Sequence, residues 1–294
     1  NLRWRQFASW RRKNGLFCAI VSWIIIAIIA YTLLSAIWGY GHGWSRIFAG
    51  WRIGATHDPL DRIKVTLTAL GGVGAVGYLV IKYRERAALE RGEADEKLVR
   101  AVQQLGDASP QVRIAGVYAL ADVADTYEGP YHQRVVDILC GYLRTDRLLK
   151  DANGDTRYAT NDDGTPNYDQ PLSADSAVES TILSVLTSHL RASRSTTQGP
   201  WSDCNIDLHR TILTEEVDLS DTIINKITCK ATIFKNQCTF SGAKLKQEAD
   251  FSDAVFHKFT WLDGVNFPDS TKFWGTSFEM TAVFDSSTFG GEVV

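Results

Sequence analysis

The sequence of 294 residues has few of the groups that carry enzyme chemistry. Its five cysteines are an odd number and contain no C-x-x-C pair, which fits a reducing compartment rather than a disulfide framework. None of the six histidines pairs with Cys, His or Glu at metal-ligand spacing. Neither a G-x-S-x-G elbow nor a P-loop occurs. We therefore expect no metal, no cofactor and no enzymatic activity.

One glycine-rich segment matches a cofactor motif by its letters alone. Residues 72–77 read Gly-Val-Gly-Ala-Val-Gly, which fits the dinucleotide fingerprint G-x-G-x-x-G. That fingerprint requires a preceding strand, an aqueous pyrophosphate pocket and a later acidic residue within a βαβ unit. The segment instead lies inside an apolar run, so we do not interpret it as a dinucleotide site.

Two long segments contain no charged residue. Residues 16–38 form an apolar run of 23 residues, enough to cross about 30 Å of hydrocarbon as a helix. Residues 65–81 form a shorter run of 17 residues between two lysines that can reach the membrane interface. We expect transmembrane helices at about 16–38 and 65–81, in a hairpin over residues 1–82. For the second run, a buried helix of a soluble core is the alternative.

The distribution of basic residues predicts the orientation of this hairpin. Residues 1–14 carry five Lys or Arg and residues 82–100 carry six, whereas the loop 41–64 carries four in 24 residues. Because basic residues favour the inner side of a membrane, we expect both ends of the chain in the cytoplasm. With no ionisable residue inside either run, no proton or ion path is expected.

Small residues in the second run predict close packing of helices. Thr68 with Gly72, and Gly71 with Ala75, form small-x-x-x-small pairs, which let two helices approach closely. We expect this contact either within the hairpin or in a homo-oligomer.

Aromatic residues between the two runs predict a contact with membrane lipid. Trp44, Phe48 and Trp51, together with Ile47, fall on one face of a helix. Such a face is typical of a short helix that lies on a bilayer surface. An ordinary aromatic belt at the ends of the transmembrane helices is the alternative.

Residues 83–195 are expected to form a helical region on the cytoplasmic side. Residues 83–106 predict a charged helix, and residues 107–125 look like the second helix of a HEAT-like unit, with Arg113 where such units often carry arginine. Fewer than three such units do not stand alone. We therefore expect a small helical cap on the domain that follows.

The polar stretch 151–175 predicts a flexible acidic loop. Asp151, Asn153 and Asp155 have the spacing of a calcium loop, but the glycine and glutamate that such a loop requires are missing. After the loop, Ser176 and Glu179 predict a capping box at the start of another helix. We expect that helix to cover the open edge of the next domain.

The last third of the chain carries an 11-residue repeat. Two interleaved series place Phe or Leu at all ten positions: Phe240, Leu245, Phe251, Phe256, Leu262, Phe267, Phe273, Phe278, Phe284 and Phe289. Neither a helical nor a plain strand period describes this spacing. A fixed short period predicts a stacked solenoid, in which these ten side chains form the structural core.

The repeat resembles the pentapeptide-repeat family, whose units read A-(D/N)-(L/F)-x-x. Residues 249–253 (Ala-Asp-Phe-Ser-Asp) and 217–221 (Val-Asp-Leu-Ser-Asp) carry this pattern. The resemblance implies a right-handed quadrilateral β-helix over residues 203–290, with bulged corners at the six-residue steps. The order of hairpin, helices and repeats resembles bacterial membrane-anchored members, which implies a membrane-anchored α+β fold in the bacterial cytoplasmic (plasma) membrane.

The preferred function is a non-enzymatic, membrane-tethered scaffold whose cytoplasmic β-helix presents a surface to an unidentified protein partner. The alternatives are a subunit of a larger membrane complex held by the hairpin, and a membrane effector or defence protein with a cytoplasmic sensor. A fourth follows from the resemblance, because some family members mimic DNA and bind DNA gyrase, a topoisomerase. Residues 201–294 carry 14 Asp or Glu against 8 Lys or Arg. Direct binding of nucleic acid is not expected.

The last coil has no evident cap before Val294, and the chain starts at Asn1. An uncovered coil invites association of edges. We therefore expect either a dimer or further residues to cover it.

Overall fold

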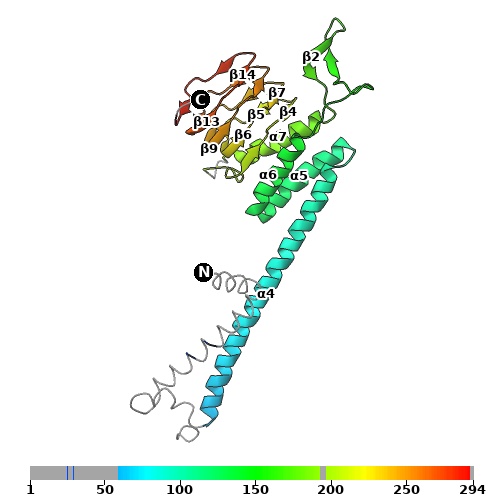
Figure 1. Cartoon of the computed structure of the whole chain (residues 1–294). Helices are drawn as coiled ribbons and strands as arrows, with labels where there is room; N and C mark the ends of the chain where they lie inside the picture. Colours follow the sequence, from blue (N-terminus) through cyan, green and yellow to red (C-terminus); the bar gives the residue numbers. More distant parts are fainter. Residues whose placement is uncertain (1–24, 26–28, 30–58, 193–196, 292–294) are drawn as a thin grey trace, which may run out of the picture. The chain divides into compact units, whose positions relative to one another are not determined.

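The computed structural model describes residues 25, 29, 59–192 and 197–291 (Figure 1). The chain forms two compact units, residues 1–91 and residues 92–294. Helix α4 (Pro59–Leu105) is 47 residues long and contributes to both units. Its side chains are described at residue 72 and from residue 74 onward.

The prediction of a membrane anchor is wrong. Among the described residues, no helix is both long enough and apolar enough to cross a bilayer. The expected second span, 65–81, lies within α4, and this helix continues without a break into charged residues. Its 17 uncharged residues fall short of the roughly 20 that a typical span needs. The membrane-anchored fold class and the multi-pass membrane location are corrected accordingly.

Most other residues of the expected hairpin lie outside the part of the chain that the structure describes. Apart from Ile25 and Ile29, the expected first span 16–38 lies outside the described residues. The expected interfacial residues Trp44, Phe48 and Trp51 lie outside them as well.

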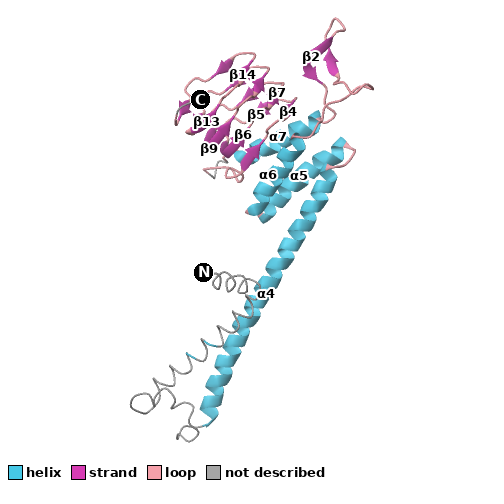
Figure 2. Ribbon diagram, viewed as in Figure 1, coloured by secondary structure: helices cyan, strands magenta, loops and turns pink. Residues whose placement is uncertain are grey.

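Three further helices form a small layer in the second unit. Helices α5 (Pro110–Tyr127) and α6 (Pro130–Leu143) both begin with proline, whose missing N–H has no helical partner to lose at the first turn. Helix α7 (Ser176–Leu190) packs against α5 and α6 (Figure 2). The inner faces of these helices are fully buried and belong to the same hydrophobic core as the strands that follow.

Arg113 joins this layer to the turn that follows α4. Its guanidinium donates to the carbonyl oxygens of Asp107 (2.6 Å) and Ala108 (3.0 Å) and pairs with Asp175 at the start of α7. Tyr142 of α6 donates its hydroxyl proton to the same carboxylate at 2.7 Å. The arginine noted in the sequence therefore ties together helices that lie far apart along the chain.

A two-stranded arm occupies much of the segment for which the sequence predicted a flexible acidic loop. Strands β1 (Tyr158–Thr160) and β2 (Pro166–Pro171) pair antiparallel. The carboxylate of Asp151 accepts backbone N–H groups of Asn153 and Asp155, both at 2.9 Å, and so forms a turn. Among the described residues, no three His, Cys, Asp or Glu side chains are grouped to hold a metal ion.

A parallel β-solenoid of about four turns follows the helices. Its strands are β3 (Asn205–Asp207), β4 (Ile212–Leu213), β5 (Val217–Asp218), β6 (Ile223–Thr228), β7 (Ile233–Phe234), β8 (Cys238–Thr239), β9 (Lys244–Asp250), β10 (Val255–Phe256), β11 (Thr260–Trp261), β12 (Asn266–Phe267), β13 (Ser270–Lys272), β14 (Ser277–Phe278), β15 (Ala282–Val283) and β16 (Thr288–Phe289). The sheets are β4-β7-β10-β14, β5-β8-β11-β15 and β3-β6-β9-β12-β16, with β13 also beside β9. The first and second halves of β6, and likewise of β9, belong to different sides of the solenoid. The three sheets therefore form four rows of paired strands. This arrangement is compatible with the expected quadrilateral β-helix.

The register explains the repeat. Val255 pairs with Ser277, and Thr260 pairs with Ala282, so one coil holds 22 residues, or two 11-residue repeats. In the first coil the step is 21, since Ile212 pairs with Ile233. Between β6 and β9 the register shifts by one residue, and the step changes from 21 to 22. This is why the sequence pattern is less regular in the first coils.

Left-handed corners mark each repeat. The residues with positive φ in the solenoid are Arg210, Asp221, Ala231, Gly242, Asp253, Gly264, Gly275 and Ser286. Seven of them lie two positions after a Leu or Phe of the core and Ala231 lies two positions after Cys229, in each case within a five-residue step. Only three of the eight are glycines, so composition alone does not reveal these corners.

Nine of the ten repeat residues belong to the core of the solenoid or pack against it. Six are at most 4% exposed: Phe240, Leu245, Phe251, Phe256, Leu262 and Phe267. Phe273, Phe278 and Phe284 are partly buried against the same core, whereas Phe289 is 39% exposed. Rings of successive coils stack, with centroids 4.4 Å apart for Phe234 and Phe256 and 4.9 Å for Phe256 and Phe278.

Candidate functional site

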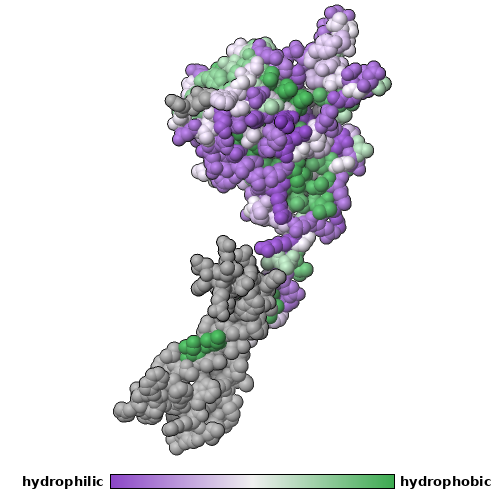
Figure 3. Space-filling view, viewed as in Figure 1, coloured by the Kyte–Doolittle hydropathy of each residue, from purple (hydrophilic) through white to green (hydrophobic). Residues whose placement is uncertain are grey.

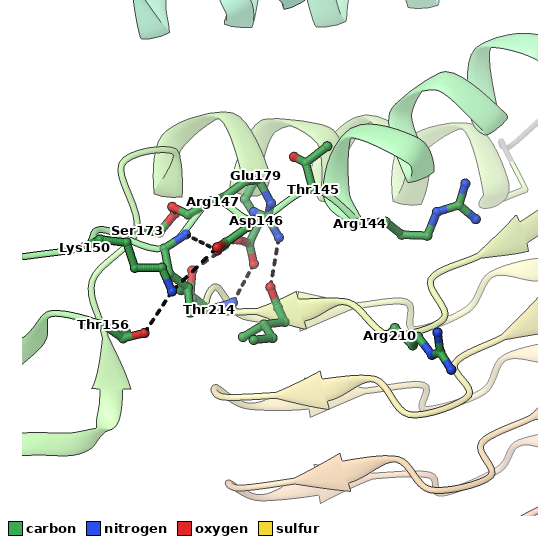
Figure 4. Close-up of a pocket in the computed structure, with 12 residues that line it drawn as sticks. Arg144, Thr145, Asp146, Arg147, Lys150, Thr156, Ser173, Glu179, Arg210 and Thr214 are labelled. Atoms are coloured by element: carbon green, nitrogen blue, oxygen red, sulfur yellow. Dashed lines mark hydrogen bonds and ion pairs between the residues drawn. The ribbon is translucent and has the colours of Figure 1, made fainter. Parts of the chain in front are cut away.

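A cavity of about 300 Å³ lies where the end of α6, the base of the arm and the first coil meet (Figure 4). The helical side contributes Arg144 and Arg147, and the arm contributes Lys150 and Thr156. The first coil contributes Arg210, Ile212 and Thr214. Side chains from three separate parts of the chain bring charges of both signs to this junction.

A buried ion pair forms one wall of the cavity. The side chains of Arg147 and Glu179 are 4% and 0% exposed, and Arg147 Nη1 donates to Glu179 Oε2. Arg147 Nη2 donates to the carbonyl oxygens of Leu143 (3.0 Å) and Ile212 (2.8 Å). The pair therefore connects α6, α7 and the first coil.

Glu179 holds the solenoid through the other side of its carboxylate. Oε1 accepts the backbone N–H groups of Thr214 (2.7 Å) and Glu215 (3.0 Å), and Oε2 accepts the Thr214 hydroxyl (3.1 Å). These bonds satisfy a buried carboxylate, which would otherwise be very costly to remove from water. They also fix the turn between β4 and β5.

The predicted capping box at the start of α7 does not form. Asp175 is the N-cap, without a capping bond from its side chain, and Glu179 points into the junction. The sequence pattern Ser176-x-x-Glu179 does not show whether Glu179 caps the helix or forms a buried ion pair, because its partner Arg147 lies 32 residues earlier in the chain. No motif or spacing in the sequence indicated a role for Arg147.

The opposite end of the cavity has a second ion pair. Arg144 Nη1 pairs with Asp207, and the same nitrogen lies 3.4 Å from Nδ1 of His209. Burial works to raise the pKa of Asp207, but hydrogen bonds with His209 and the charge of Arg144 outweigh it and hold that pKa below its usual value. Arg210 follows at a left-handed corner with φ 55°, and its side chain is exposed.

The remaining charged groups come from the arm side. Lys150 Nζ lies 3.5 Å from a carboxylate oxygen of Asp146 and donates to the Thr156 hydroxyl at 3.2 Å. In Figure 4, Lys150 and Thr156 lie on one side of the buried pair, and Arg144 and Arg210 lie on the other. The cavity is therefore bordered by cations on both sides.

A Ser–His–Asp contact elsewhere has the wrong arrangement for nucleophilic catalysis. Ser188 Oγ lies 3.2 Å from Nδ1 of His189, and Nε2 lies 3.1 Å from Asp125. Nδ1 is also 2.6 Å from the carbonyl oxygen of Val185, so this nitrogen must donate its proton there. A donating nitrogen cannot accept the serine proton, because general-base catalysis needs a free lone pair.

The outer face of the solenoid carries a small apolar patch, which we call the outer patch: Phe259, Trp261, Met280 and Val283. The rings of Phe259 and Trp261 stack with centroids 6.1 Å apart, and Trp261 lies in register with Val283 of the next coil. Phe259 and Met280 are 40% and 42% exposed. Figure 3 shows that polar side chains cover much of the visible surface, with apolar areas between them.

No family model, no curated protein and no solved structure matches this chain. The two surfaces described above are therefore interpreted from their own geometry.

The predicted helix-packing residues stay partly untested. Gly72 and Ala75 lie exposed on α4, and nothing lies within 4 Å of a Cβ placed on Gly72. The side chain of Thr68 and the surroundings of Gly71 lie outside what the structure describes. Close helix packing at these four positions remains a prediction.

Proposed function

We propose that this chain is a protein-binding scaffold rather than an enzyme, and that the solenoid provides its recognition surface. A parallel β-solenoid is compatible with such a role, because stacked coils make an extended and rigid outer face. The core side chains are used in packing, so recognition falls to outward residues. We also assign the repeat to the pentapeptide-repeat class, on its sequence pattern and its four rows of parallel pairs.

The outer patch is the observation that carries this proposal. Aromatic residues and methionine are enriched at the centres of protein interfaces, where they bury much area at small entropic cost. Phe259 and Trp261 form a stacked pair at β11, which is an inner strand of its sheet, and the charged residues Lys258 and Glu279 directly precede Phe259 and Met280 in the chain. This combination suits a protein partner that brings a complementary apolar surface.

The test is a crosslinked pull-down that compares three versions of the full chain. Replacing Phe259 and Trp261 by serine removes the outer patch without touching the core. The control is Trp274→Ser, because Trp274 is 68% exposed but lies outside the patch. We expect one specific partner to be retained by the wild type and the control, to be lost by the double variant, and to bind the purified wild type directly. The same proteins in all three pull-downs would contradict the proposal.

A further inference from the structure

We propose that the protein segment bound at the outer patch carries an arginine next to apolar residues, a proposal that rests on the scaffold function above and adds the chemistry of the partner. The outer patch belongs to the face of the sheet β5-β8-β11-β15. The same face carries carboxylates beside the aromatic rings, so one partner segment can contact both.

The alternation of buried and exposed side chains shows which residues face outward on this sheet. In the third coil, Thr260 and Leu262 are 1% and 0% exposed, so the residues before, between and after them point to solvent. The outward positions of the four coils in turn are Glu216, Asp218 and Ser220; Gln237, Thr239 and Ser241; Phe259, Trp261 and Asp263; and Thr281, Val283 and Asp285. These positions include four carboxylates and no lysine or arginine.

Most of this negative charge is not compensated. Asp218 pairs with Arg191 at 2.7 Å. By contrast, the side chains of Glu216 and Asp285 make no hydrogen bond or ion pair within the part of the chain that the structure describes. Opposite charge favours association and suppresses wrong partners, so the face suits a positively charged segment.

Two aspartates stand side by side on successive coils, next to the outer patch. Gly264 N donates to the carbonyl oxygen of Asp285 at 2.8 Å, so Asp263 and Asp285 are in register, at the strand spacing of about 4.8 Å. Asp263 accepts the Ser241 hydroxyl at 2.6 Å, whereas Lys258 precedes β11 and lies at the opposite end of the strand. Like charges directly opposite each other are destabilising, and a cation between the two carboxylates would relieve them.

The aromatic ring beside these carboxylates favours arginine over lysine. Trp261 lies two positions before Asp263 on the same side of the strand, and the cations found over aromatic rings in the described residues stand elsewhere. A guanidinium can stack on an aromatic ring and donate in a fork to carboxylates, whereas an ammonium is a compact point charge. Phe259, Met280 and Val283 would then contact the apolar neighbours of that arginine.

The test is NMR of the tryptophan side-chain N–H groups of the full chain at low ionic strength. The probes are three capped tripeptides: Leu-Arg-Leu, Leu-Lys-Leu and Leu-citrulline-Leu, in which citrulline keeps the shape of arginine without its charge. Trp261→Phe identifies the Trp261 signal by its disappearance. We expect the arginine peptide to shift this signal and to bind about fivefold more tightly than either other peptide, which is about 1 kcal/mol.

The variant that tests the carboxylates combines Asp263→Asn with Asp285→Asn, and it should weaken binding of the arginine peptide about fivefold. The matched control combines Asp253→Asn with Asp269→Asn, which removes the same charge from exposed aspartates outside this sheet. Unchanged binding in the control supports the site. Equal binding of the arginine and citrulline peptides, equal binding of the lysine peptide, or equal weakening in both double variants would overturn it.

The tripeptides also separate this site from the scaffold function. A partner that is lost from the serine double variant, but bound equally well by the wild type and the Asp263→Asn, Asp285→Asn variant, would leave the scaffold function in place and overturn the arginine site. Selective binding of the arginine peptide, with the same proteins in all three pull-downs, would support the arginine site and contradict the scaffold function alone.

Discussion

Arg147 and Glu179 are the residues on which the junction depends most. Each charge costs several kcal/mol to remove from water, and only the partner and the surrounding hydrogen bonds offset that cost. Here the bonds to Leu143, Ile212 and Thr214 use nearly every donor and acceptor of the pair. The pair therefore specifies how helices and solenoid meet, and it does so only while both charges are present.

The first prediction concerns the loss of one charge from this pair. Glu179→Gln leaves the Arg147 guanidinium buried without its counter-ion, so the free energy of unfolding should fall by about 3–5 kcal/mol. Urea denaturation of the full chain measures this change. The matched control is Arg134→Ala, which breaks an ion pair whose two side chains are 57% and 59% exposed and should cost no more than about 1 kcal/mol. Similar costs for both variants would show that the buried pair has no special role.

At the scale of elements, a charge ladder joins three successive coils on the outside of the solenoid. Glu248 of β9 lies 2.5 Å from Lys226 Nζ of β6 and 3.0 Å from Lys272 Nζ, at the end of β13. Its side chain is 26% exposed, so water screens the two contacts only in part. Hydrogen bonds from the two lysines lower the pKa of Glu248 below the ordinary value of 4.5. The ladder therefore stabilises the stacking of coils only while Glu248 is ionised.

The second prediction is a pH dependence of this stabilisation. Because the pKa of Glu248 is lower in the folded state, its contribution is present above the unfolded value near 4.5 and disappears as pH falls through the folded value. Glu248→Gln should therefore lower the free energy of unfolding by up to about 1 kcal/mol at neutral pH, with a difference that closes below the ordinary glutamate pKa. Denaturation curves over this pH range provide the measurement. Glu216→Gln changes an exposed glutamate without an ion pair to a described residue and should show no such trend. A constant difference for Glu248→Gln would refute the ladder's role.

The sequence predicted the elements whose signal repeats along the chain. Phe240, Phe251 and Phe256 recur at fixed spacing, and a fixed spacing in sequence becomes a column in a solenoid. The junction gave no such signal, because Arg147, Glu179 and Thr214 are single residues that meet only after folding. The apolar run 65–81 misled for a related reason. The sequence predicted the apolar run and the charged helix 83–106 as two separate elements, whereas they form parts of the single helix α4.

At the scale of the whole molecule, one hydrophobic core runs from the helical layer into the solenoid. Leu120 of α5, Leu139 of α6 and Leu186 of α7 belong to the same cluster as Leu213 and Phe251. Repeat proteins usually gain stability coil by coil, with each coil contacting only its neighbours. In this chain the first coil is covered by α6 and α7 instead, which contact β3 and β5. The helices and the first coils should therefore behave as one cooperative unit.

The last prediction tests this unit with two fragments. Residues 92–294 form a compact unit with their own core, so this fragment should fold and unfold in a single transition. Residues 203–294 lack the helices, so Ile206 and Leu208 would lose their cover, and this fragment should fail to fold or should aggregate. Circular dichroism reports the helices, and hydrogen exchange of β6 and β9 reports the coils. Coinciding transitions in the longer fragment support a shared core, because buried apolar surface at the junction would then couple the two layers. A shorter fragment as stable as the longer one would show that the coils hold themselves together and that the helices are an attachment.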